Sequence, residues 1–412
     1  MATAAPEELD ILRDLRARTY AGSGVFWIAD DELGVFDPDV AEQVSKANFE
    51  DLTLPDRLVH LLLGRRGKPF SWKQVRAAWL AQLRRLGDAH GVARLEAHMR
   101  RLLDERLDRP LDLVWAAQEV CTRALVPIVL DGLSPADTTR VLRDQTFKLA
   151  RLLTQRPEPS TWRKTARAIG VQVAAGLVAR RELRGRAAGR RPRRLDLADP
   201  LVDMLPELGM DRAVDAATAA LTAIAGPPGA AAACLLYELT RRPDWAERLA
   251  GELAPLPPER LHESPTRAAP LTHRFVKETL RMWSPPSLLN RSVRNPIHLD
   301  QVDLEVGQRY FQSPYVIHHD PRSWRDPDVF DPDRWLPGAE HAACRPAAYV
   351  PFGWAPRACV GAGLGTAQLI LLCRLACTCY RIQPAAPEAV RMALSAVPMP
   401  LDFRGTIRLR PA

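Results

Sequence analysis

The segment Pro351–Gly361, which reads PFGWAPRACVG, constrains this chain more than any other part of its sequence. Glycine and proline favour a loop, and the apolar run GLGTAQLILLCRLACTCY that follows is typical of a helix. Cys359 therefore stands near a helix start, where amide N–H groups and the helix dipole favour a thiolate. The loop alone leaves two interpretations open, a thiolate that binds a metal and a buried free cysteine.

Two further motifs precede this loop. KETLR places Glu278 and Arg281 on one face of a helix, where an ion pair is possible. FDPDRW then places Arg334 in a loop bounded by proline. In this order and at these separations, the three motifs resemble the cytochrome P450 family. The resemblance is dense from about residue 215 to residue 383 and thin before that.

The resemblance implies a heme b cofactor, iron protoporphyrin IX, with Cys359 as the axial ligand of the iron. In this family the glutamate and the two arginines form a buried network that braces the cysteine loop. That structural role falls here to Glu278, Arg281 and Arg334. Phe352 would shield the sulfur from water. Four residues would contact the heme propionates: Arg357, Arg291, Trp72 and Arg76.

The periodicity of apolar residues is helical from about Ser71 to Glu252, and short strands and turns follow the KETLR helix. This arrangement predicts an α+β fold that is mainly α, with a small β portion. The resemblance makes it the cytochrome P450 fold. Because no Gly/Ser-rich linker divides the chain, we expect residues 1–412 to form a single domain. His318 and His319 lie in a segment that we expect to be structural.

Composition limits the remaining classes. The N-terminus carries charges throughout, and no run of about 18 apolar residues is present, so we expect neither a signal peptide nor a membrane span. The seven cysteines form no secreted disulfide pattern, which favours the cytoplasm. Eight arginines lie between Arg180 and Arg194 without interleaved aromatic residues, so we expect a solvated loop rather than a nucleic-acid surface.

The chain departs from the family pattern at two places. Ala355 replaces the usual second glycine of the cysteine loop, which alanine can fill at modest cost. The larger departure is on the distal helix, where the family carries an acid and an alcohol that deliver protons to bound dioxygen. Aligning Ala225–Gly226 with the start of that pattern puts Pro228 at the acid position and Gly229 at the alcohol position. We therefore assign no catalytic residue.

The same prolines predict a distortion of the distal helix at Gly226-Pro227-Pro228-Gly229. Neither proline has a backbone N–H, so the carbonyls of Ala223 and Ile224 lose their helical partners. Each proline inside a helix costs roughly 3 kcal/mol or more. We expect a kink above the heme, or two helices joined by a turn.

Three functions stay open. The first is a monooxygenase of a small to medium apolar or aromatic metabolite, with protons from ordered water or a substrate hydroxyl. The second cleaves an N–O or O–O bond already present in the substrate or oxidant, as in nitrene-type C–N bond formation, peroxygenase chemistry or a rearrangement. The third is a non-catalytic docking module with the same fold. The expected substrate pocket, capped by residues 49–68, is lined by Ala225, Gly226, Gly229, Ser287, Leu288 and Leu289.

The resemblance also implies partners. A small-molecule substrate is expected, and a ferredoxin or reductase would donate electrons at the proximal face. The dominance of Arg, Ala, Leu and Pro suggests a high-GC bacterial coding bias. The resemblance is to the soluble bacterial type of the family, and we expect a role in secondary metabolism.

Overall fold

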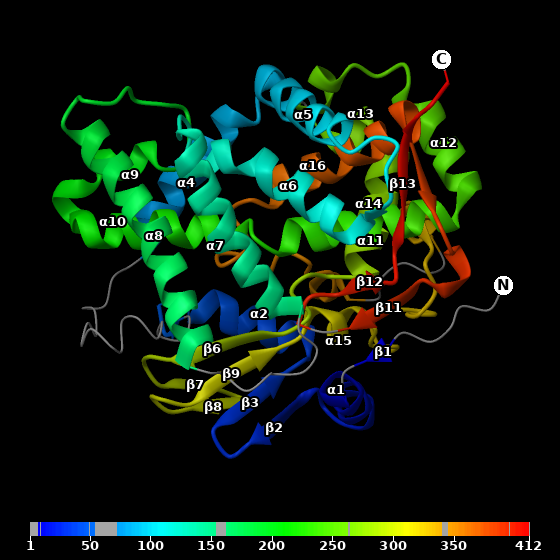
Figure 1. Ribbon diagram of the computed structural model, residues 1–412. Coiled ribbons are helices and arrows are strands. Elements are labelled where there is room, and N and C mark those ends of the chain that lie inside the picture. Colours follow the sequence, from blue (N-terminus) through cyan, green and yellow to red (C-terminus); the bar gives the residue numbers. More distant parts are fainter. Residues whose placement is uncertain are drawn as a thin grey trace. The chain divides into compact units, whose positions relative to one another are not determined.

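The computed structural model describes the chain apart from residues 1–6, 9, 49, 54–71, 154–161, 263, 340–344, 395 and 412. The chain is divided into two compact units, and each unit contains stretches that lie far apart in the sequence (Figure 1). Unit 1 comprises residues 1–71, 274–362 and 392–399, and unit 2 comprises residues 72–273, 363–391 and 400–412. That residues 1–412 form one domain stays a prediction.

Unit 1 contains a five-stranded mixed sheet in the order β2-β3-β9-β6-β4. β3 and β9 run parallel, whereas β6 runs antiparallel to β9 in a register that sets Arg291 opposite Tyr310. The Asp37 side chain caps α2 by accepting from two backbone N–H groups. The main elements are α1 (Asp10–Ala21), β2 (Val25–Ala29), β3 (Glu32–Val35), α2 (Pro38–Ala47), β4 (Leu52–Thr53), α14 (Pro270–Met282), β6 (Leu289–Val293), β7 (Ile297–Leu299), β8 (Val302–Leu304), β9 (Arg309–Gln312) and α15 (Pro314–His318).

Unit 2 is mostly helical, and α6 is buried along most of its length because its sequence is apolar on nearly every face. The Asp112 side chain caps this helix. The helices are α4 (Lys73–Leu86), α5 (Ala89–Asp104), α6 (Leu113–Val129), α7 (Pro135–Leu153), α8 (Trp162–Ala187), α9 (Asp199–Asp203), α10 (Leu205–Ala223), α11 (Pro227–Arg241), α12 (Pro243–Leu253), α13 (Pro265–Ala268) and α16 (Ala362–Arg374).

Three smaller sheets complete the β portion, in the orders β1-β11-β12, β10-β13-β5 and β7-β8. Their remaining strands are β1 (Glu7–Glu8), β5 (Leu111–Asp112), β10 (Tyr380–Pro384), β11 (Arg391–Leu394), β12 (Met399–Leu401) and β13 (Arg404–Leu409). The mainly helical α+β fold with a small β portion is thus confirmed.

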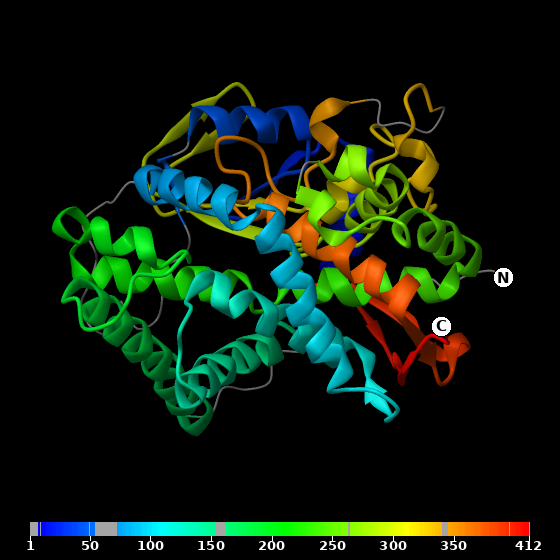
Figure 2. The ribbon, with the colours of Figure 1, turned by 90° about the horizontal axis from the view of Figure 1, so that it is seen from above.

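The long distal helix is broken, as predicted, but the prolines play a different part in the break. α10 ends at Ala223, and α11 begins at Pro227 with Gly226 as its N-cap residue. Figures 1 and 2 show the two helices following one another with a short irregular segment between them. Pro227 and Pro228 occupy the first turn of α11, where a helix leaves its N–H groups unbonded anyway. The expected cost of prolines inside a helix therefore does not arise.

The arginine-rich stretch is not the solvated loop that we expected. Its first part belongs to the last turns of α8, where Arg186 is buried and bonds Asp196 through both terminal nitrogens at 2.6 and 2.7 Å. Arg193 bonds Asp199 and Asp203 on the surface. Much of this positive charge is therefore matched by acidic side chains within unit 2.

Two helical stretches are long and apolar enough to cross a membrane by length and composition alone. They are Leu205–Arg241 and Ala362–Cys379. In the most apolar 18-residue window of each stretch, 67% and 50% of the residues, respectively, are buried. Core helices of folded proteins pass the same test, and the break at residues 224–226 interrupts the first stretch. The absence of a membrane span stays a prediction.

Candidate functional site

The cysteine loop of unit 1 folds back on itself. The backbone N–H of Cys359 donates to the carbonyl of Phe352 at 2.6 Å, and Gly353 between them adopts a φ of 75° that favours glycine. Ala355 does not lie in this left-handed region, so alanine is accommodated there. The Cys359 side chain is exposed, whereas burial raises the pKa of the Cys121 thiol to about 12. Cys359 is therefore accessible to solvent, whereas Cys121 is not.

Two arginines of unit 1 form a cationic pair. Arg291 lies in β6 and donates to the Asn290 carbonyl at 2.9 Å, and Arg357 of the cysteine loop donates to the Leu52 carbonyl at 2.8 Å. Burial and then the charge of Arg357 lower the pKa of Arg291 to about 10. Such a pair is stabilised when an anion binds between or beside the two guanidinium groups. The two propionates of heme supply that charge, so these residues fit the cofactor.

The predicted bracing network is present and fully buried. Arg281 makes a two-point ion pair with Glu278 at 2.7 and 3.0 Å, and Arg334 donates to the same carboxylate at 3.1 Å. The Trp335 indole and the Asp331 backbone N–H also donate to Glu278. The remaining guanidinium donors of the two arginines reach backbone carbonyls, among them those of residues 318, 325, 327 and 329. The network therefore ties α14 to the segment before the cysteine loop.

His318 extends this network to the cysteine loop, a link that the sequence did not identify. Its Nδ1 donates to the Arg281 carbonyl at 3.0 Å, and its Nε2 accepts the backbone N–H of Val350 at 2.8 Å. Both bonds together require a neutral ring with the proton on Nδ1. Burial and the charge of Arg281 lower the pKa of His318 to about 3, so the ring stays neutral. His318 is thus a structural residue, as expected.

Two side chains of α6 donate hydrogen bonds to backbone carbonyls at the break between α10 and α11 in unit 2. Gln118 Nε2 donates to the Gly226 carbonyl at 2.9 Å, and Thr122 Oγ1 donates to the Ile224 carbonyl at 3.2 Å. One of the carbonyls that we expected to lose its partner has therefore found a side-chain donor. The sequence shows polar residues on an otherwise apolar α6, and this was the available signal.

The alcohol position of the distal pattern is closed by α6. A Cβ atom at Gly229 would lie 2.1 Å from Gln118 Oε1 and 2.6 Å from the Gln118 Cα. Contacts this short are forbidden, so a side chain at Gly229 requires α6 to move. Ala225 and Gly226 are buried beside it. The close packing of α6 is therefore incompatible with an alcohol side chain at this position.

The other predicted site residues are distributed over both units. Trp72 and Arg76 lie in unit 2 at the start of α4, one helical turn apart, and Trp72 is exposed. In unit 1 Ser287 is fully buried, whereas Leu288 and Leu289 are half-buried at the start of β6. The predicted heme contacts of Trp72 and Arg76, and a shared substrate pocket, stay predictions. Of the expected cap at residues 49–68, only residues 50–53 are described.

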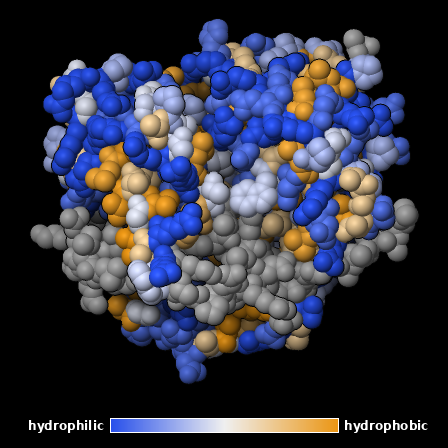
Figure 3. Space-filling model, viewed as in Figure 1, coloured by the Kyte–Doolittle hydropathy of each residue, from blue (hydrophilic) through white to orange (hydrophobic). Residues whose placement is uncertain are grey.

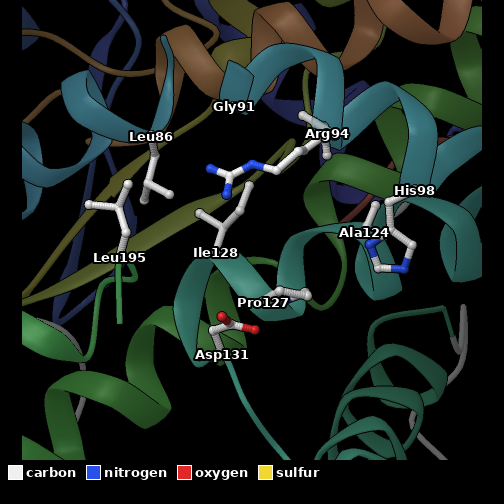
Figure 4. A pocket seen from close by; sticks show the side chains of 10 residues that line it. Leu86, Gly91, Arg94, His98, Ala124, Pro127, Ile128, Asp131 and Leu195 are labelled. Atoms are coloured by element: carbon white, nitrogen blue, oxygen red, sulfur yellow. The ribbon is translucent and has the colours of Figure 1, made fainter. Parts of the chain in front are cut away.

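Unit 2 also has a surface cavity of about 280 Å³, shown in Figure 4. Apolar side chains from α4, α5 and α6 line it together with Arg94, His98 and Asp131. None of the residues predicted for the substrate pocket contributes to this cavity.

Comparison with known proteins agrees with the site. A family model described as Cytochrome P450 matches residues 193–396. A zebra fish cytochrome P450, solved with progesterone, superposes with a TM-score of 0.77 at 18% identity and covers 97% of this chain and 100% of that chain. With the cysteine loop, the buried network and the paired arginines in place, the chain belongs to the cytochrome P450 family of heme-thiolate enzymes.

The matched curated relatives are similar over one segment only. Cyclooctatin synthase from Streptomyces melanosporofaciens is 33% identical over 132 residues, which is 31% of this chain and 28% of that protein. Leukotriene-B4 omega-hydroxylase 3 from Mus musculus is 30% identical over 162 residues, which is 38% of this chain and 31% of that protein. The aligned segment therefore spans less than a third of each of these relatives.

Proposed function

We propose that this protein is a monooxygenase that acts on a small to medium apolar or aromatic metabolite and takes its protons from a source other than the family's acid and alcohol. The observation that supports it is the proximal site, in which an exposed Cys359 stands in a loop braced by Glu278, Arg281 and Arg334. Heme bound by a thiolate supplies the electron donation that favours O–O cleavage.

The residues of the chain have separate tasks in this proposal. The paired guanidinium groups of Arg291 and Arg357 bind the propionates and set the orientation of the cofactor. The buried network and His318 hold the cysteine loop in one conformation. The Thr122 hydroxyl donates its one proton to the Ile224 carbonyl and so stabilises the helix break. Ordered water or a hydroxyl of the substrate supplies the protons that Pro228 and Gly229 cannot hold.

A second candidate follows from the same break. Pro228 and Gly229 carry no acid or alcohol, and α6 excludes a side chain at Gly229. A substrate or oxidant that already carries a weak N–O or O–O bond needs no proton relay and no electron donor. The second candidate is therefore cleavage of such a bond, with C–N bond formation, peroxygenase chemistry or a rearrangement as the outcome.

The two candidates are separated by what turnover requires. Heme-loaded protein is incubated with a substrate panel that includes apolar compounds, aromatic compounds and N–O compounds, with and without dioxygen and a ferredoxin–reductase pair. Strict dependence on both supports the monooxygenase, and turnover that needs neither refutes it in favour of the second candidate. For the ligand, Cys359→Ser should abolish the thiolate-type spectrum of the ferrous CO complex. Retention of that spectrum would contradict the assignment.

The setting of the enzyme is part of the proposal. We infer a soluble, cytoplasmic protein of bacterial type with a role in secondary metabolism, supplied with electrons by a ferredoxin or reductase at its proximal face. The cysteine usage supports this setting. Fractionation of the source cells, with the protein detected by antibody, would test it.

A further inference from the structure

The outward face of α8 in unit 2 is apolar where a surface helix is normally polar. Trp162 is 75% exposed, Val173 44% and Leu177 60%. Val173 follows Trp162 by eleven residues, which is about three helical turns, so both point the same way. Figure 3 shows hydrophobic residues gathered over the position of α8 in Figure 1. Large exposed apolar patches on a folded unit mark interaction surfaces.

A glycine in the middle of this face indicates the kind of partner. Gly170 is exposed, and a Cβ atom built on it would meet nothing within 4 Å. Glycine inside a helix costs about 1 kcal/mol relative to alanine. No contact among the described residues requires glycine at this position, and its φ is not positive. Close approach of a second helix backbone would require it, and Ala166, one turn earlier, is also small.

The face is complementary to itself when a second copy is turned end for end. Trp162 lies eleven residues before Val173, and Arg184 lies eleven residues after it on the same face. A two-fold axis through Val173 therefore sets the Trp162 ring against the Arg184 guanidinium of the other copy, twice over. Arg184 is exposed, and no acidic side chain bonds it in the part of the chain that the structure describes. The same axis sets Leu177 near Ile169.

We propose that α8 is a dimerisation helix that pairs antiparallel with α8 of a second copy about a two-fold axis at Val173. An anionic lipid surface fits the face less well. Two of its neighbouring cations are already matched within unit 2, since Arg180 bonds Asp211 and Arg181 bonds Asp137, and Arg163 lies over the Trp162 ring. A phosphate-rich surface would thus gain little from them.

Sedimentation velocity on the full-length heme-loaded protein, over a wide range of protein concentration, tests the association. Gly170→Gln adds a long side chain to the paired face and favours the helix in the monomer. We expect it to weaken dimerisation by about tenfold or more while leaving the melting temperature unchanged or higher. Gly251→Gln is the matched control, because Gly251 lies in α12, is exposed and also has open space around its Cβ. A wild-type protein that is monomeric throughout, or a dimer indifferent to Gly170→Gln, overturns the proposal.

A cross-linking experiment tests the two-fold axis. Val173→Cys lies on the axis and should form a disulfide between copies under mild oxidation, because the residue meets its own copy. Leu177→Cys faces Ile169 instead and should cross-link far less. Preferential cross-linking of Leu177→Cys overturns the antiparallel arrangement. Monomers that co-sediment with phosphatidylglycerol vesicles, and lose this binding in a Leu177→Lys variant, overturn the dimer in favour of a membrane surface.

Discussion

His318 should make the stability of this protein depend on pH, because it is a buried histidine that must stay neutral. Its ring donates from Nδ1 to the Arg281 carbonyl and accepts at Nε2 from the Val350 N–H. A proton on Nε2 would remove that acceptor and place a cation beside Arg281. The pKa of about 3 in the folded state lies far below the value of about 6.5 for an unfolded histidine.

The sign follows from proton binding. Between pH 6.5 and pH 3 the unfolded chain binds a proton at His318 and the folded chain does not, so stability falls as the pH falls. Each pH unit in that window costs about 1.4 kcal/mol, and at pH 5 the cost is about 2 kcal/mol. His319 has its pKa lowered in the same direction and adds a second proton.

The comparison that isolates His318 is the free energy of unfolding of wild type and His318→Asn, measured with denaturant from pH 7 to pH 4.5. At pH 7 the variant is less stable by about 1–3 kcal/mol, because it leaves the Val350 N–H without its acceptor. Its slope against pH should be shallower than the wild-type slope, by an amount that grows to about 1.4 kcal/mol per pH unit below about pH 5.5. The carboxylates and His319 contribute to both proteins, so they cancel in the difference. Equal slopes would refute the reasoning.

Three further perturbations follow from the contacts. Glu278→Gln leaves two buried arginines without their carboxylate, so the free energy of unfolding should fall by about 3–5 kcal/mol in denaturant titrations. Arg291→Gln removes one of the two guanidinium groups proposed to bind the propionates, so heme transfer to apomyoglobin should be about tenfold faster. The same change relieves the repulsion from Arg357, so the heme-free protein should be no less stable. Thr122→Val removes the donor to the Ile224 carbonyl, so the free energy of unfolding should fall by about 1–3 kcal/mol in denaturant titrations.

The sequence was sufficient for the proximal site because its residues lie in short motifs. Glu278 and Arg281 are three residues apart on one helix, so helical geometry alone predicts their pairing. Arg334 and Cys359 came from the order of motifs, which carried the resemblance. By contrast, His318 acts through Val350, thirty-two residues away, and neither residue stands in a motif that predicts the bond. Contacts of this kind depend on tertiary packing, which local patterns do not encode.

The helix break shows the same limit. The sequence predicted a break near Pro227 and Pro228, but not that these residues begin a helix. Two helices form here because Gln118 and Thr122, both in α6, donate hydrogen bonds to the carbonyls at the break. Because α6 lies more than a hundred residues earlier, no window around the prolines contains this information.

The packing of α6 also predicts that the family's alcohol cannot be restored by one substitution. At Gly229 even alanine places a Cβ atom 2.6 Å from the Gln118 Cα, which is backbone and cannot rotate away. Gly229→Ala should therefore lower the free energy of unfolding by about 1–3 kcal/mol, and Gln118→Ala should not rescue it. Gly251→Ala, with open space around its Cβ, serves as the control and should be neutral or stabilising. If Gly229→Thr folds as well as wild type, α6 can retreat from the break and the alcohol position is open after all. If it does not, α6 keeps the alcohol position closed, and the dependence of turnover on dioxygen and an electron donor decides between the two proposed reactions.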